Sequence, residues 1–180
     1  MNSHLDLSDI ETATLGHFLS DGFMAPSIQA LLPDTRVFGP ALTVRMPGDD
    51  GTALVEALSF AQPGQVIVVD RCGDFRHACW GAVTTIGEAF PVWCRGRSPI
   101  TTKPRGLGGD VNIAINCGGV AVRPGDMVLA DESGVVVMDP GQAETFCRRA
   151  RLMQQQEIEI LDRLRAGETL TQITRGEKSP

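Results

Sequence analysis

The chain has 180 residues, 42% hydrophobic and 21% charged, which is enough for one globular domain with a buried core. Its formal net charge of -6 argues against nucleic acid as a partner, because contacts to phosphate need clustered Lys and Arg. No apolar run is long enough to cross a membrane and the acidic N-terminus does not resemble a secretory signal, so we expect a cytoplasmic protein.

The first half of the chain alternates between helical and strand patterns. Apolar residues at helical spacing predict a helix over 12–23, and Gly39-Pro40 punctuates the chain before a strand predicted over 41–46. A short amphipathic helix follows over 52–61, and the apolar run 66–70 is typical of a strand buried on both faces. Strand, helix and strand in this order predict a βαβ unit.

The second half is punctuated by glycine and closes with a long helix. Short apolar runs separated by Gly and Pro predict strands, and the segment between the first two is rich in Gly, Pro and Thr, which predicts an exposed loop. The predicted elements are a strand over 91–95, a loop over 98–110, strands over 111–115 and 120–122, a hairpin over 127–138, and a helix over 142–165 capped by Gly167. The tail after Gln172 is predicted to be mobile. We therefore expect one α/β domain over residues 1–180.

Two acids follow the apolar strand 66–70. Asp70 ends the strand and Asp74 comes just after Gly73, and acids at strand ends often line the sites of α/β sheets. The structural alternative is that one of them caps the next helix. Both interpretations remain open from the residues alone.

The segment Trp80-Gly81-Ala82-Val83 is the second candidate. If a helix begins here, its free N–H groups form a site for a carboxylate or a phosphate. The alternative is that Trp80 belongs to the core and Gly81 to a tight turn.

Further candidates are weaker. Arg95 and Arg97 flank a glycine and suit an anionic ligand or a solvated loop, and His77 is either a general base or a surface residue. Cys94 and Cys117 lie on apolar strands, which favours packing over nucleophilic chemistry.

Some classes of site are excluded. The five cysteines form no CxxC pair and have no histidine at ligand spacing, which indicates reduced thiols and no zinc site. The sequence has no GxGxxG after a strand, no P-loop and no GxSxG, so nucleotide-based folds and a methyltransferase are disfavoured.

The order of these motifs resembles the family of 4-hydroxy-4-methyl-2-oxoglutarate aldolase and the regulator of ribonuclease activity A (RraA-like). The resemblance covers about residues 15–167. The motifs that carry it are Phe38-Gly39-Pro40, Pro63-Gly64-Gln65-Val66, Gly73-Asp74, Ala78-Cys79-Trp80-Gly81, Phe90-Pro91-Val92, Cys117-Gly118-Gly119, Pro124-Gly125-Asp126 and Ala130-Asp131-Glu132-Ser133-Gly134-Val135.

The resemblance implies a swivelling ββα sandwich with a long C-terminal helix, assembled as a homotrimer or hexamer. It also implies a lyase, dependent on Mg2+ or Mn2+, that makes pyruvate from 4-hydroxy-4-methyl-2-oxoglutarate by aldol cleavage or decarboxylates oxaloacetate. The substrate carboxylate would bind the backbone at Gly81, Ala82 and Val83. Glu157, reaching over from a neighbouring subunit, would join the surroundings of the metal, and Asp70 and Asp74 are the other candidates for the site.

The chain departs from the family pattern at two places. Ala82 stands where family enzymes carry an acid, and the Arg-Asp pair that holds substrate and metal in the family is absent from the sequence. About two dozen residues, a crossover of helix and strand, are missing between Thr84 and Phe90 relative to the family spacing. The catalytic residues are therefore unassigned, and the alternative function is a non-catalytic trimer that binds a protein such as a ribonuclease.

Overall fold

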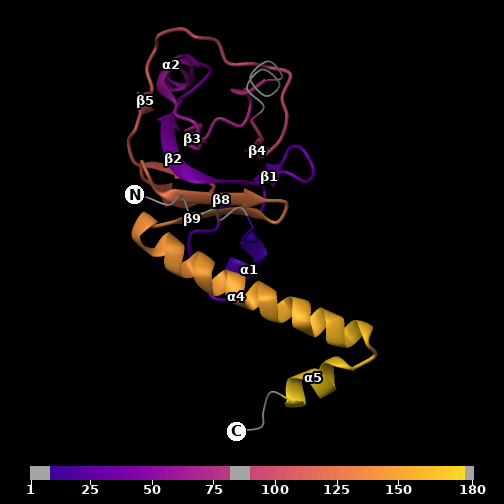
Figure 1. Ribbon diagram of the computed structural model, residues 1–180. Helices are drawn as coiled ribbons and strands as arrows, with labels where there is room; N and C mark the ends of the chain where they lie inside the picture. Colours follow the sequence, from indigo (N-terminus) through magenta and orange to yellow (C-terminus); the bar gives the residue numbers. More distant parts are fainter. Residues whose placement is uncertain (1–8, 82–89, 177–180) are drawn as a thin grey trace.

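The protein, described here from a computed structural model of residues 9–81 and 90–176, is built on a five-stranded sheet (Figure 1). Its longest strand, β2 (Val37–Arg45), pairs in parallel with β3 (Val66–Asp70) and antiparallel with β8 (Met127–Asp131). β8 pairs with β9 (Gly134–Met138), and β5 (Asp110–Val111) pairs with the end of β2. The N-terminal half of β2 thus pairs with β8, and its C-terminal half pairs with β3 and, at its end, with β5.

The helix α2 (Thr52–Phe60) connects β2 to β3 and covers one face of the sheet. Ala53, Leu54 and Ala57 are its buried residues, and they pack on Leu42 and Val44 of β2. The predicted βαβ unit is therefore confirmed, with the helix within one residue of its predicted bounds.

The other face is covered by α1 (Thr12–Gly16) and the long helix α4 (Pro140–Arg165), as Figure 1 shows. Residues of the β8–β9 hairpin alternate between two clusters. Leu129 and Val136 pack toward α1 and α4, whereas Val128 and Val137 pack toward the strands and loops on the opposite face. Because both faces of the hairpin are covered, its sequence is almost continuously apolar.

Two small two-stranded sheets flank the main one. β1 (Gln29–Ala30) pairs antiparallel with β4 (Trp93–Cys94), and β6 (Ile115–Cys117) pairs antiparallel with β7 (Val120–Val122) across Gly118-Gly119. The strand predicted over 91–95 is therefore confirmed but is shorter, and the strand predicted over 120–122 is confirmed with the same bounds.

The predicted helix over 12–23 was too long, because α1 ends at Gly16. The chain then turns to pair with the hairpin: the Met24 amide donates to the Val135 carbonyl at 2.9 Å, and the Val137 amide donates to the Gly22 carbonyl at 2.8 Å. Gly22 has φ +88°, a conformation that glycine adopts without strain.

Three strand predictions need correction. β2 begins at Val37, so Gly39-Pro40 lies inside the strand, and Gly39 is needed there because a Cβ would collide with the Gly64 carbonyl oxygen. The strand over 111–115 is broken at Asn112, whose φ is +58°. β3 has only Val68 buried within this chain, so it is not covered on both faces by the described residues.

The long helix α4 is capped at its N-terminus by Asp139, whose carboxylate accepts from the Gly141 amide at 2.8 Å, and it ends before Gly167 with φ +94°, as predicted. Its second half projects away from the sheet (Figure 1). The prediction of a mobile tail after Gln172 is wrong for the residues up to 176, because the helix α5 (Leu170–Gly176) lies there and its Ile173 is buried. We call α5 and the projecting half of α4, residues 152–176, the arm. No helix in the described ranges is long and apolar enough to cross a membrane.

Candidate active site

The candidate site lies where β3 ends, next to the start of α2. β2 and β3 run in parallel and in register to Arg45 and Asp70, so their carboxyl ends lie together at one edge of the sheet. The following loop, 71–81, returns past this edge, and the Ala78–Thr101 bridge fixes it to the segment after β4. This placement agrees with the rule that sites of α/β sheets lie at the carboxyl ends of parallel strands.

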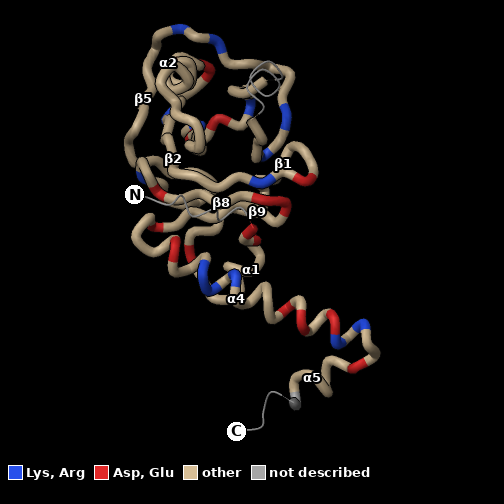
Figure 2. The backbone as a smooth tube through the Cα atoms, viewed as in Figure 1, with Lys and Arg blue, Asp and Glu red and all other residues tan. Residues whose placement is uncertain are grey.

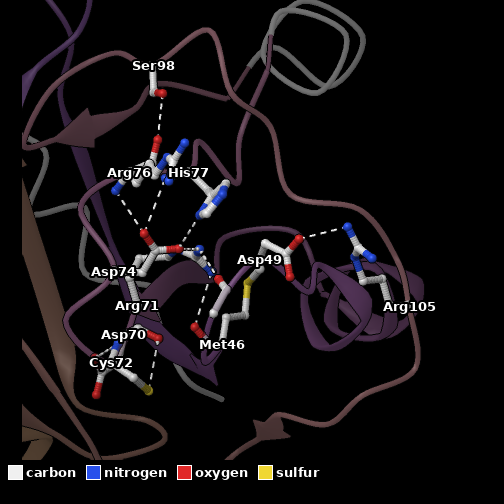
Figure 3. A network of polar contacts seen from close by, with 11 residues as sticks. Met46, Asp49, Asp70, Arg71, Cys72, Asp74, Arg76, His77, Ser98 and Arg105 are labelled. Atoms are coloured by element: carbon white, nitrogen blue, oxygen red, sulfur yellow. Dashed lines mark hydrogen bonds and ion pairs between the residues drawn. The ribbon is translucent and has the colours of Figure 1, made fainter.

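Asp74 is the centre of a polar network in this loop (Figure 3). Its Oδ2 accepts a hydrogen bond from Arg71 Nη2 at 2.7 Å and lies 2.8 Å from His77 Nδ1. Its Oδ1 accepts from the amides of Arg76 at 2.8 Å and His77 at 3.3 Å. Burial alone would raise the pKa of Asp74, but these amide and imidazole hydrogen bonds outweigh it and lower the pKa to about 2.

Arg71 connects this network to the segment between β2 and α2 by hydrogen bonds. Its guanidinium donates to the carbonyls of Met46 at 3.1 Å and Gly48 at 2.6 Å, besides its ion pair with Asp74. Its Nε is buried without a partner among the described residues. The Asp74 carboxylate is therefore held in place from several sides.

The start of α2 is held to the loop 98–110 by Asp50, whose side chain is 3% exposed. Its carboxylate accepts from Thr52 Oγ1 at 2.6 Å and from the amides of Arg105 at 2.8 Å and Leu107 at 2.5 Å. The Thr52 hydroxyl and these amides keep the pKa of Asp50 well below its usual range. Asp49 adds an ion pair with Arg105 at 2.8 Å, also visible in Figure 3.

Asp50 was not among the predicted site residues, although a signal was present. An Asp next to the start of a predicted helix is a common signal of a helix N-terminus, and Asp50 lies one position before the N-cap residue Gly51. Its contacts to Arg105 and Leu107 come from a loop more than fifty residues away, which no local pattern indicates.

Asp70 and Asp74 both lie at the predicted edge, but each is used within the chain. Asp70 accepts from the Cys72 amide at 2.7 Å and the Asn116 amide at 3.3 Å. Neither carboxylate caps an α-helix among the described residues; each holds a loop amide two positions ahead instead.

The other predicted residues are more scattered. Gly81 is the last described residue before the gap, and Ala82 and Val83, with the helix predicted to open there, lie outside the described residues. Glu157 is exposed on α4, and α4 lies on the opposite side of the sheet from α2 (Figure 1). A single chain therefore does not bring Glu157 to the site.

The arginine and cysteine candidates make contacts within the fold or lie at its surface. The Arg95 guanidinium lies 5.0 Å from the centre of the exposed Phe75 ring, and Arg97 is exposed. Ser98 donates to the Arg76 carbonyl at 2.6 Å. Burial raises the pKa of the Cys117 thiol to about 11, which agrees with a packing role.

The described residues do not form a metal site. Within 9–81 and 90–176, no three His, Cys, Asp or Glu side chains come together in a way that would hold a metal ion. The carboxylates nearest the site are occupied by amides, Arg71 and His77. The donors of the described part of one chain therefore do not fit Mg2+ or Mn2+.

Figure 2 shows how charge is distributed: the arm carries both acidic and basic residues, and basic residues mark the loop that passes α2. The fold and this edge define an α/β domain with a loop-built site next to a parallel strand pair. The family model described as RraA-like, Aldolase/RraA, matches residues 6–89 and 83–137, and this chain belongs to that family.

Similar proteins agree with this assignment. A putative 4-hydroxy-4-methyl-2-oxoglutarate aldolase of Halalkalibacterium halodurans is 34% identical over 154 positions, covering 73% of each chain. A protein of Pseudomonas syringae pv. tomato has a similar crystal structure, with TM-score 0.78, 26% identity, and coverage of 93% of this chain and 90% of that one. Streptomyces coelicolor RraAS2, from the RNase ES inhibitor RraA family, gives TM-score 0.67 at 27% identity, covering 84% and 91%.

The same comparisons also concern the segment that the sequence analysis expects to be missing between Thr84 and Phe90. The alignment to the Halalkalibacterium protein has 154 positions, whereas 73% of 180 residues is about 131, so about two dozen positions have no counterpart in this chain. The family model matches in two pieces that overlap at residues 83–89. The interval between Thr84 and Phe90 lies outside the described residues, but both findings agree with a gap there.

Proposed function

We propose that this chain is a lyase that forms pyruvate from 4-hydroxy-4-methyl-2-oxoglutarate by aldol cleavage, or from oxaloacetate by decarboxylation. The observation that carries the proposal is the 34% identity to a putative aldolase of this substrate, over nearly three quarters of both chains. The fold supports it by placing the loop 71–81 at a sheet edge suited to a small ligand.

The substrate site of this proposal is the backbone from Gly81 to Val83, which the family resemblance assigns to the substrate carboxylate. The Ala78–Thr101 bridge and the 2.9 Å hydrogen bond from the Thr102 amide to the Ala78 carbonyl hold the chain leading to it. A carboxylate is well bound by consecutive backbone amides, and the proposal places the 2-keto acid there.

Mg2+ or Mn2+ dependence remains part of the proposal through the resemblance alone. The described donors of one chain do not by themselves fit a divalent cation. Pyruvate release with each metal and with a chelator measures the dependence directly.

Assembly as a homotrimer or hexamer in the cytoplasm is also proposed. The arm exposes Ile158, Leu161 and Leu164, which are 58%, 41% and 36% exposed, and a second copy of the chain would cover them. Glu157, Leu161 and Leu164 follow the i, i+4, i+7 spacing of one helix face, so an arm packed by this face would carry Glu157 toward the neighbouring copy.

The second candidate function is a non-catalytic regulator that binds a protein partner. Two observations favour it: Ala82 replaces the family acid, and about two dozen aligned positions are missing. RraAS2, one of the similar structures, is described as an unusual member of a family of ribonuclease inhibitors.

The two candidates separate in one set of experiments. Purified protein is given each keto acid with Mg2+, with Mn2+ or with a chelator, and pyruvate is measured by coupling to lactate dehydrogenase. Pyruvate release above the protein-free rate supports the lyase. No release with either metal, together with specific capture of a ribonuclease in a binding assay with purified components, supports the regulator.

A further inference from the structure

Two neighbouring loops form one basic surface. The Ala78–Thr101 bridge and the 2.6 Å hydrogen bond from the Ser98 hydroxyl to the Arg76 carbonyl hold the loop 71–81 against the segment after β4. A side-chain contact joins them again, since the Arg95 guanidinium lies 5.0 Å from the centre of the Phe75 ring. We call the exposed residues of these two loops the basic surface: Phe75, Arg76, Arg95, Arg97, Ile100 and Lys103.

The charge of the basic surface is not balanced by its surroundings. Segments 71–81 and 95–109 contain six Lys and Arg and one acid, whereas the rest of the chain contains ten Lys and Arg and twenty-one acids. The four cations of the surface form no ion pair in the parts of the chain that the structure describes, although Arg71 and Arg105 beside them are paired with Asp74 and Asp49. Such a surface attracts a short anionic segment, while a long polyanion would also meet the acidic remainder of the chain.

The basic surface also offers apolar contact area. Phe75 is 74% exposed and Ile100 is 41% exposed. Aromatic and arginine side chains are enriched in protein interfaces, and ion pairs at an exposed surface contribute little by themselves. The partner that fits best therefore presents an apolar side chain between two carboxylates.

The arm has this arrangement in Glu157-Ile158-Glu159. Consecutive residues of an α-helix point about 100° apart, so the two glutamates flank Ile158, which is 58% exposed. Both glutamates are exposed, and neither forms an ion pair with another described residue. Because α4 covers the opposite face of the sheet from α2, the arm points away from the basic surface of its own chain (Figure 1).

We propose that the arm of one copy binds the basic surface of a second copy, with Ile158 against Phe75 and Ile100 and with the two glutamates next to the arginines. The inference rests on the homo-oligomer proposed above and names the surface that receives the arm. The two sides of this contact are different surfaces, so the interface is heterologous, and heterologous contacts close into rings such as a trimer.

Reversing the charges on each side tests the contact. The surface variant Arg76→Glu/Arg97→Glu and the arm variant Glu157→Arg/Glu159→Arg place like charges opposite each other. Each should raise the protein concentration at which half of the assembly dissociates by about tenfold or more, as measured by sedimentation of a dilution series. The variant with all four substitutions restores opposite charges and should return to within about threefold of wild type.

Arg123→Glu and Glu132→Arg are the matched controls, because both residues are exposed and lie outside the basic surface and the arm. Neither should change the dissociation, and circular dichroism checks that every variant is folded.

A surface variant that assembles like wild type would overturn this contact and leave the homo-oligomer standing, with the basic surface open to an acidic partner of another kind. Dissociation of both charge-reversed variants without recovery in the combined variant would also overturn it. A monomeric wild type would overturn the homo-oligomer and this inference together.

Discussion

At the scale of single residues, Asp74 illustrates how a carboxylate can lie at a predicted site and still be fully engaged within the fold. Arg71, the His77 ring and two amides surround it. The position of Asp74 after an apolar strand and a glycine was predictable from the sequence. Its partners were not, because the conformation of a loop is set by contacts with other segments, here Met46 and Gly48 through Arg71.

The lowered pKa of Asp74 predicts a pH dependence of stability. A carboxyl group whose folded pKa is about 2 rather than 3.8 stabilises the fold above about pH 4, and this contribution is lost as the pH falls toward 2. The difference in free energy of unfolding between wild type and Asp74→Asn should therefore be smaller at pH 2 than at pH 4 to 5. Urea unfolding at a series of pH values measures it.

Asp110→Asn is the matched control, since its ion pair with Arg45 is exposed and such pairs contribute at most about 1 kcal/mol. A difference for Asp74→Asn that stays constant down to pH 2 would show that its carboxylate does not depend on the network described.

The contacts of Asp50 predict how firmly the loop 98–110 is held. Replacing it by Ala removes the acceptor of the Arg105 and Leu107 amides, so the loop 98–110 should open more often. We expect trypsin to cut after Arg105 several-fold faster in Asp50→Ala than in wild type, as read by mass spectrometry. Asp49→Ala removes only an exposed ion pair and should cut at nearly the wild-type rate; equal rates in all three proteins would contradict the role of Asp50.

At the scale of elements, the apolar stripe of the long helix α4 is interrupted by Gln154-Gln155-Gln156-Glu157, and part of this polar break has a structural explanation. Gln154 accepts from the Glu11 amide at 3.1 Å and donates to the Asp9 carbonyl at 2.9 Å, while Arg151 binds the Asp9 carboxylate with two hydrogen bonds of 2.8 and 2.6 Å. This part of the break is thus neither a solvated face nor a ligand site. It holds the N-terminal segment onto α4.

Gln154→Ala should loosen that segment. Loss of two hydrogen bonds predicts a destabilisation of about 1–2 kcal/mol and faster hydrogen exchange of the amides from Glu11 to Leu15. Gln155→Ala, at an exposed position on the same helix, is the control and should leave the exchange unchanged. Unchanged exchange in Gln154→Ala would mean that the segment is held by Asp131 and Arg151 alone.

Prediction from sequence succeeded where the pattern is local and turn or capping residues mark both ends of the element. The helix 52–60, the hairpin 127–138 and the long helix capped at Gly167 all have such marks. It failed where a long-range contact decides the backbone: α1 stops early because Met24 pairs with Val135, and β2 begins early because Gly39 lets the Gly64 carbonyl approach. The polar network of the site belongs to this second kind.

At the scale of the whole molecule, the arm leaves the body of the chain, yet it has an ordered structure of its own. Arg163 binds Glu168 across the turn between α4 and α5 with hydrogen bonds of 3.0 and 2.7 Å, and Ile173 is 1% exposed. An ordered projection with exposed Ile158 and Leu161 is expected to pack on another surface, which we propose is a second copy of the chain.

Light scattering coupled to size exclusion tests the assembly. We expect a trimer or hexamer for wild type and a smaller species for Leu161→Glu, because a buried charge at the interface would be unpaired. Leu152 is 58% exposed but lies two and a half turns earlier, on the opposite side of the helix, so Leu152→Glu should leave the assembly intact. A monomeric wild type would contradict the proposed assembly and with it the contribution of Glu157 from a neighbour.

The lyase function is tested by measuring pyruvate release from 4-hydroxy-4-methyl-2-oxoglutarate by the wild-type chain, with the Halalkalibacterium relative assayed alongside it. We expect turnover that exceeds the protein-free rate and scales with protein concentration. No release by this chain with Mg2+ or Mn2+, under conditions in which the relative is active, would contradict the lyase function and favour a family member that binds without catalysis.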